Sequence, residues 1–174
     1  MIFHGKIGHK QKDMTTGQMF LTIGAILLLS LLIINVNKAT SNRVVTIYSN
    51  EAIIEATSLA EAVFQDIQTK SFDEETISQT ITDRSLLTPS SSLGHESGEN
   101  NPKHYDDIDD YNDYEITNTT NLMGDFTVSV SVNYVDEDDL STESSSPTFL
   151  KRVTITVDNS NLPSTLTFEH IVSY

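Results

Sequence analysis

The sequence has no cysteine and no tryptophan among its 174 residues, and it is poor in basic residues. Without cysteine the chain has no disulfide, no thiol nucleophile and no cysteine-based metal site. Lys and Arg together number 10 against 25 Asp and Glu, so the net charge is -15 and the pI is near 4.4. This balance excludes nucleic acid as a natural partner, because a phosphate backbone is bound by clustered Lys and Arg.

Sequence motifs of common enzyme active sites are also lacking. The five histidines form no spaced pair of the metalloprotease kind. No serine sits in a nucleophile-elbow sequence, and no glycine-rich loop is suited to hold phosphates. We therefore expect a non-enzymatic protein with no small-molecule substrate, and no cofactor apart from the calcium ion considered below.

What the sequence does contain is an uncharged apolar run from Met19 to Ile34, MFLTIGAILLLSLLII. A bilayer core of about 30 Å needs roughly 20 helical residues, and residues 17–36 supply that length. Thr22 and Ser30 are polar, but a helix tolerates them because their hydroxyls bond back to its own carbonyls. We predict a transmembrane helix over residues 18–37.

The basic residues before this run bear on its orientation. Lys6, Lys10 and Lys12 precede the span and the remainder is acidic, which favours a single-pass protein with a cytoplasmic N-terminus and a periplasmic or extracellular C-terminal domain. Residues 1–17 are then a cytoplasmic leader or tail. A cleaved secretory signal is the main alternative, although no small-x-small cleavage site closes the run cleanly.

A second helical segment follows the span. Residues 38–49 are rich in β-branched types, which have low helix propensity, so they are either a linker or part of one long helix. From Asn50, a plausible N-cap, apolar residues recur at three- and four-residue spacing, which predicts an amphipathic helix with one face to bury. We assign residues 38–72 as the amphipathic continuation of the first helix. The residues that define its apolar face are Ile53, Ala56, Leu59, Ala60, Val63, Phe64 and Ile67.

The segment 73–124 is polar and acidic and is assigned as a loop region. It is rich in Ser, Thr, Gly, Asn and Glu, with one short element expected at Ile77–Leu87. The stretch at 90–102, SSSLGHESGENNP, lacks apolar periodicity and is expected to be mobile.

Residues 125–174 read as an antiparallel β-sheet. Asp125–Val135 and Lys151–Val157 alternate between apolar and polar side chains, and Thr165–Tyr174 does so with a mixed phase. Short connections favour a meander whose apolar face is covered by the amphipathic helix. The predicted fold class is α+β, a long N-terminal helix packed on a small C-terminal sheet.

This order of parts resembles the type IV pilin and pseudopilin family. The string YDDIDDYNDY at 105–114 and the closing KRVTITVDNSNLPSTLTFEHIVSY are similar to segments of minor pilin-like proteins. The resemblance implies a structural subunit that assembles with copies of itself or with other pilin-like subunits into a surface filament or a secretion or pilus complex. Helix packing would use Phe20, Ile23, Gly24, Leu27, Leu31 and Ile34.

The chain departs from the family at its processing site. In the family a peptidase cuts after a Gly that precedes Phe or a similar residue, and a Glu stands fifth in the mature chain. Here Gly17 precedes Gln18, and the fifth residue is Thr22. A Thr hydroxyl cannot match the electrostatic contact of that Glu. Two interpretations stay open for Gly17, a cleavage site and a helix-start glycine, and the functional alternative is an anchored binding or sensor module that does not polymerise.

The acidic decapeptide at 105–114 is the best candidate for metal chemistry. Ca²⁺ takes six to eight oxygen ligands at about 2.3–2.6 Å, and carboxylates are dense here, although the EF-hand spacing is absent. The candidate calcium ligands are Asp106, Asp107, Asp109, Asp110 and Asp113. The alternative is a solvated turn in which Tyr105, Ile108 and Tyr111 pack inward and the carboxylates point outward.

Overall fold

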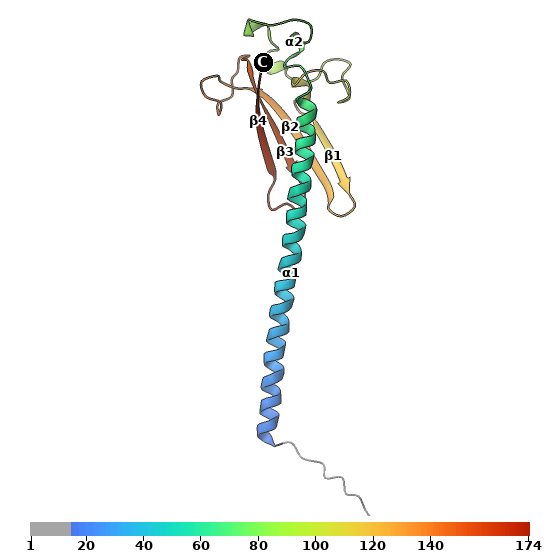
Figure 1. Ribbon diagram of the computed structural model, residues 1–174, viewed down its shortest axis with the longest axis vertical. Helices are drawn as coiled ribbons and strands as arrows, with labels where there is room; N and C mark the ends of the chain where they lie inside the picture. The colour runs from blue at the N-terminus through green and yellow to red at the C-terminus, as the bar shows by residue number, and fades with distance from the viewer. Residues whose placement is uncertain (1–14) are drawn as a thin grey trace, which may run out of the picture. The chain divides into compact units, whose positions relative to one another are not determined.

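A computed structural model describes residues 15–174 of the chain, which divide into two compact units between Val45 and Thr46. One long helix and a four-stranded sheet are the main elements (Figure 1). The elements in order are α1 Thr16–Ile67, α2 Glu74–Ser78, the 3₁₀ helices η1 Arg84–Leu86, η2 Ser90–Ser92 and η3 Asp109–Tyr111, and the strands β1 Glu115–Thr120, β2 Gly124–Tyr134, β3 Leu150–Asp158 and β4 Leu166–Ser173.

Helix α1 is continuous over 52 residues, so the linker alternative for residues 38–49 is wrong. Asn50 lies inside the helix and is not an N-cap, and the helix ends at Ile67, before the predicted residue 72. Its start resembles a capping box, because the backbone N–H of Thr15 donates to Oε1 of Gln18 at 3.2 Å. Along the β-branched stretch, the hydroxyl of Thr40 donates to the carbonyl of Val36 at 2.9 Å.

The sheet is an antiparallel meander in the order β1-β2-β3-β4. The three predicted strands correspond to β2, β3 and β4, which confirms the predicted α+β layout. The structure adds β1, which lies inside the segment 73–124 that the sequence assigns as a loop region. Its sequence, EITNTT, carries little apolar signal because the strand is exposed at the edge of the sheet and pairs only with β2. Gly124, with φ of 76°, closes the turn between β1 and β2.

The core of the second unit lies between the later turns of α1 and one face of the sheet (Figure 1). Ala52, Ala56 and Ala60 are at most 2% exposed, and their four-residue spacing places these small side chains in one row. Strands β2 and β3 alternate between buried and partly exposed residues, as the sequence predicts. The remaining buried apolar residues of these elements are Phe64, Ile67, Phe126, Val128, Val130, Val132, Tyr134, Val153, Ile155 and Val157.

Edge strand β4 explains the mixed phase in the sequence. Leu166, Phe168, His170 and Val172 are half-buried, and the residues between them are exposed. The ring of His170 stacks on Phe64 of α1, with centroids 3.5 Å apart and planes at 16°. A histidine therefore occupies an apolar row because its flat ring packs against an aromatic side chain.

Candidate functional site

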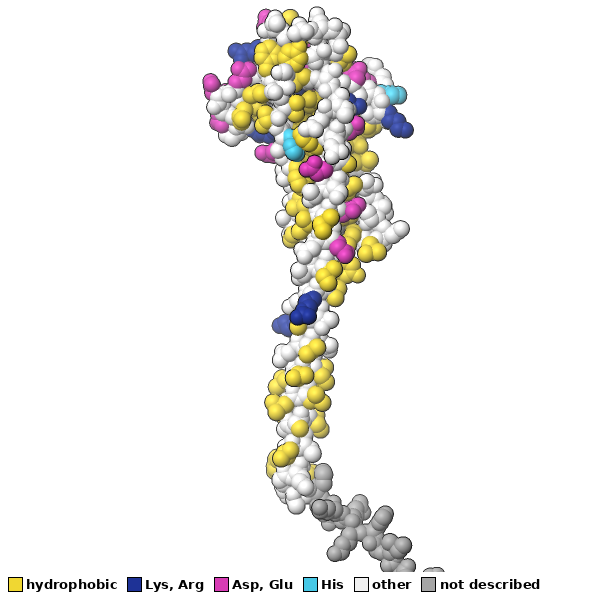
Figure 2. All heavy atoms as spheres, viewed as in Figure 1, with side chains coloured by type: hydrophobic (Ala, Val, Ile, Leu, Met, Phe, Trp, Pro, Cys, Tyr) yellow, Lys and Arg dark blue, Asp and Glu magenta, His cyan; other side chains and the backbone are white. Residues whose placement is uncertain are grey.

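The apolar segment of α1 is the first candidate functional surface. Every large apolar side chain from Met19 to Val36 is between 49% and 74% exposed. Figure 2 shows hydrophobic side chains along the visible face of this segment. Residues 17–36 span about 30 Å of helix, the thickness of a bilayer core. Helix α1 is therefore long and apolar enough to cross a membrane.

The two polar residues of this segment are satisfied within the helix, as predicted. The hydroxyls of Thr22 and Ser30 donate to the carbonyls of Met19 and Ile26, each at 2.8 Å. Thr22 therefore offers no charge to a neighbouring subunit.

The predicted helix-packing residues are all accessible, but the structure does not single them out. Phe20, Ile23, Leu27, Leu31 and Ile34 are exposed, and so are apolar side chains around the rest of the helix, including Leu21, Leu28 and Leu32. Gly24 is partly exposed, and an added Cβ there would meet no atom within 4 Å. Which face packs against a partner stays a prediction.

Gly17 lies at the second position of α1, next to Gln18. Its backbone is helical, and an added Cβ would meet no atom within 4 Å. Alanine is the better helix former by about 1 kcal/mol, so nothing among the described residues requires glycine here. The basic residues predicted to precede the cleavage site lie outside the described residues.

The acidic decapeptide forms a turn around η3. Tyr105, Ile108 and Tyr111 are buried, as predicted for the solvated-turn alternative. The second half of that prediction is wrong for three carboxylates, because Asp107, Asp109 and Asp110 are each 0% exposed. The buried residues of this turn therefore include two tyrosine rings and three of its acids.

The five candidate calcium ligands do not converge on one point. Asp109 pairs with Lys151, whereas Asp107 and Asp110 accept hydrogen bonds from each other's backbone N–H groups at 3.1 and 3.2 Å. Asp106 and Asp113 are exposed. Asp110 alone among the five belongs to a group of converging ligand atoms in the described chain.

Lys151 is the centre of a buried polar cluster, with 0% of its surface exposed. Its ammonium donates to the carbonyl of Phe72 at 2.6 Å, to Oδ2 of Asp73 at 3.0 Å and to Oδ1 of Asp109 at 2.6 Å. All three N–H groups of the ammonium therefore have acceptors. The hydroxyl of Tyr134 completes the cluster 2.7 Å from Oδ2 of Asp73.

The two carboxylates beside Lys151 titrate differently. Burial raises the pKa of Asp73, but the charge of Lys151 and hydrogen bonds from Tyr134, Lys151 and Thr88 outweigh it, so the net pKa is lowered. Burial dominates at Asp109 and raises its pKa despite Lys151. The neighbouring Asp107 has its pKa raised to about 9, by burial and by the charges of Asp109 and Asp110. The cluster ties the chain after α1 and the η3 turn to strand β3.

The sequence reasoning missed Lys151 as a buried residue. The signal was present, because Lys151 shares its strand parity with Val153, Ile155 and Val157, all of which face the core. Asp73 carried no such signal, since its role depends on contacts with residues far along the chain.

A second acidic group, which we call the Glu96 cluster, consists of Glu96, Glu99 and Asp110. One carboxylate oxygen from each lies within 4.8 Å of the others. Burial, then Glu99 and Asp110, raise the pKa of Glu96 to about 8. Sequence reasoning missed Glu96 and Glu99 because they fall in the stretch 90–102, which has no apolar periodicity.

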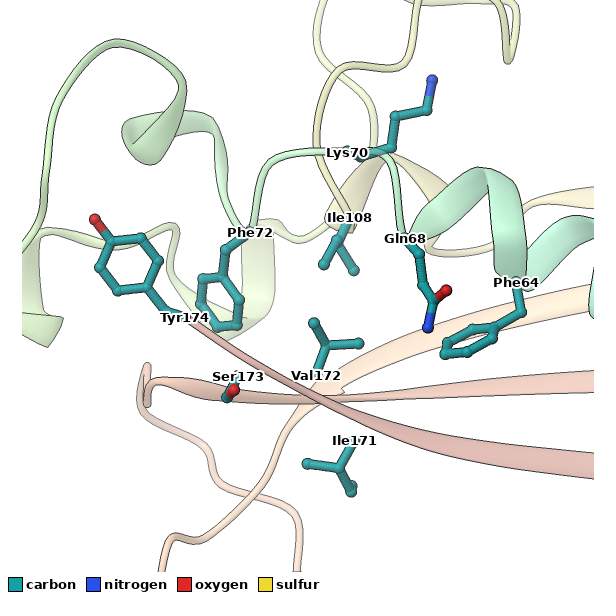
Figure 3. A pocket seen from close by; sticks show the side chains of 9 residues that line it. All are labelled: Phe64, Gln68, Lys70, Phe72, Ile108, Ile171, Val172, Ser173 and Tyr174. Atoms are coloured by element: carbon teal, nitrogen blue, oxygen red, sulfur yellow. The ribbon is translucent and has the colours of Figure 1, made fainter.

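A surface cavity of 540 Å³ lies between the end of α1 and the end of β4 (Figure 3). Figure 3 shows the ammonium of Lys70 turned away from this cavity, and it donates instead to the carbonyl of Tyr105 at 2.8 Å. The lining is mixed and brings no set of charged groups together. Its residues are Phe64, Gln68, Lys70, Phe72, Ile108, Ile171, Val172, Ser173 and Tyr174.

Comparisons with protein-family models, with curated proteins and with solved structures found no match to this chain.

Proposed function

We propose that this protein is a pilin-like, membrane-anchored structural subunit that assembles through its N-terminal helix into a filament or a secretion or pilus complex. The carrying observation is the segment Met19–Val36, which is apolar on all sides and uncovered by the described chain. In water such a surface is unfavourable at roughly 25 cal/mol per Å² of apolar area, so lipid or other helices must cover it.

Two features of α1 support assembly in addition to anchoring. Gly24 lies within the apolar segment, and small residues let a second helix approach closely in a membrane. Gly17 precedes Gln18 without a structural need for glycine, as a peptidase recognition residue would. The sequence of a long helix followed by an antiparallel meander also fits the pilin-like layout.

The N-terminus of the mature protein tests this proposal, by mass spectrometry of the membrane fraction from the native host. A chain that begins at Gln18 supports pilin-type processing and membership of an assembly. An intact Met1 contradicts processing and favours a permanent anchor.

The second candidate is a membrane-anchored binding module that does not polymerise. The Glu96 cluster favours it, because three converging carboxylates are a recognisable ligand set for a cation. Cation binding by a chain that stays monomeric in its native membrane would support this candidate over the structural subunit.

A further inference from the structure

The carboxylates of the Glu96 cluster are held in place from two sides. Oδ2 of Asp110 accepts hydrogen bonds from the backbone N–H groups of Asp106, at 2.9 Å, and Asp107, at 3.2 Å. Across the cluster, the backbone N–H of Glu96 donates to Oε2 of Glu99 at 3.2 Å. The three side chains therefore come together by specific contacts of the backbone.

Two buried oxygens of this cluster have no hydrogen-bond partner among the described residues. They are Oδ1 of Asp110 and Oε2 of Glu96. Asp110 as a whole is 0% exposed, so its free oxygen has no access to bulk water. A buried acceptor without a partner is unfavourable, and native proteins rarely leave one in that state.

The described chain supplies no positive charge to the Glu96 cluster. No Lys, Arg or His of residues 15–174 forms an ion pair with its members. Burial is the largest cause of the raised pKa of Glu96, and the negative charge of Glu74 also contributes to it. The adjacent residue Asp109 shows the contrast, because the ammonium of Lys151 lies 2.6 Å from its Oδ1.

We propose that Glu96, Glu99 and Asp110 form a binding site for a divalent cation that prefers oxygen ligands, and that Ca²⁺ is its occupant. Three carboxylates offer three to six oxygens, depending on whether each binds through one or both. Glu96 and Glu99 are half-buried, so water can reach the ion and complete its coordination. The absence of histidine and cysteine ligands makes the site unsuited to Zn²⁺.

The site does not rest on the proposed assembly, and it deepens the second candidate function by naming the ion that the second unit would bind. A bound ion would join the 90–102 stretch to the η3 turn. The η3 turn is itself fixed to β3 by the ion pair of Asp109 and Lys151. Cation binding therefore stabilises this side of the second unit whether or not the protein assembles.

The test uses the full chain in detergent micelles, stripped with EDTA and dialysed, and titrated with CaCl₂ by calorimetry. The matched variants are Glu96→Gln, Glu99→Gln and Asp110→Asn, with Glu115→Gln on exposed strand β1 as the control. We expect one Ca²⁺ per chain, a higher unfolding temperature in Ca²⁺, a tenfold or greater loss of affinity in the first two variants, and unchanged binding in the control.

Asp110 also orders backbone groups, so its variant is expected to be the least stable of the three. Glu99→Gln is therefore the decisive variant. If its far-ultraviolet circular dichroism spectrum matches that of the wild type, a loss of Ca²⁺ affinity cannot be due to unfolding. Absence of Ca²⁺ binding by the wild type overturns the proposal and leaves a shared proton as the occupant. Unchanged affinity in both glutamate variants, or tighter binding of Mg²⁺ or Zn²⁺ than of Ca²⁺, also overturns it.

Discussion

The two units of this chain differ in whether their apolar side chains are exposed or buried. From Met19 to Val36, α1 exposes every large apolar side chain, whereas from Ala52 to Ile67 the same helix buries a row of residues against the sheet. The second unit also pairs two of its buried acids internally, with Lys151 between Asp73 and Asp109. The second unit therefore has a buried core of its own, whereas the apolar surface of the first is left exposed by the described residues.

Removal of residues 1–37 should have the largest effect, because it deletes the exposed apolar segment and leaves the second unit. We expect the shortened protein to leave the membrane fraction and to lose all assembly, because the apolar segment is gone. The second unit should keep its circular dichroism spectrum and its cooperative unfolding, since its core comes from residues after Val45. An unfolded or aggregated product would show that the second unit depends on the first.

Lys151→Met tests the internal ion pairs of the second unit. The substitution leaves Asp73 and Asp109 buried without their cation, so we expect a loss of about 3–5 kcal/mol in the free energy of unfolding. Denaturant titration in detergent measures it, and membrane association should not change. Lys103→Met, at an exposed lysine, is the control, with an expected change within about 0.5 kcal/mol. A small effect at Lys151 would mean that the two carboxylates are protonated or solvated.

Tyr134→Phe removes the hydroxyl that contacts Asp73 and should destabilise the second unit by about 1–3 kcal/mol at neutral pH. The effect depends on pH. Burial and the nearby Asp73 raise the pKa of Tyr134 above its unfolded value of about 10.

The contribution of the Tyr134 hydroxyl to the free energy of unfolding is therefore fully present below pH 10 and is lost as the pH rises above 10. Unfolding titrations from pH 8 to pH 11 should show a shallower decline for Tyr134→Phe than for the wild type. Tyr48→Phe, at an exposed tyrosine, is the control. Parallel declines in all three proteins would contradict a buried, protonated Tyr134.

Two leucine substitutions compare the buried and the exposed segments of α1. Ala56 is 0% exposed, so Ala56→Leu overpacks the core and should destabilise the second unit by about 1–3 kcal/mol. Gly24→Leu adds a side chain where nothing lies within 4 Å of a Cβ, and it should leave unfolding of the second unit unchanged. It should reduce the yield of assembled protein from native membranes if a helix packs at Gly24. Equal effects of the two variants on unfolding would contradict the division into two units.

The sequence predicts the parts of the fold that follow a repeating pattern. The apolar run gives the membrane-length helix, and the period of two in 125–135 and 151–157 gives β2 and β3. Strand β1 was not predicted, because Glu115–Thr120 is an exposed edge strand whose hydrogen bonds, rather than apolar side chains, hold it in the sheet. The β-branched residues at 38–49 have low helix propensity, which favours a linker when it is considered alone. They are nevertheless helical, because helix α1 continues through them without a break.

The candidate sites were predictable only in part. The density of carboxylates at 105–114 predicts a metal site, but it does not show which of them are buried. Asp109, for example, is paired with Lys151, which is 42 residues away in the chain. Glu96 and Glu99 meet Asp110 through folding of a segment without periodicity, so no local pattern identifies them. By contrast, the exposed segment of α1 follows directly from composition.

Photocrosslinking from Leu27 in native membranes tests most directly whether the apolar segment of α1 contacts other subunits, as we propose. A photoreactive amino acid replaces Leu27, and Leu122, 74% exposed at the β1–β2 turn, carries it in the control. We predict that mass spectrometry of the Leu27 product identifies an apolar helix of a second copy or of another pilin-like subunit. Crosslinks from Leu27 to lipid alone would contradict assembly through this helix and would leave a solitary anchor.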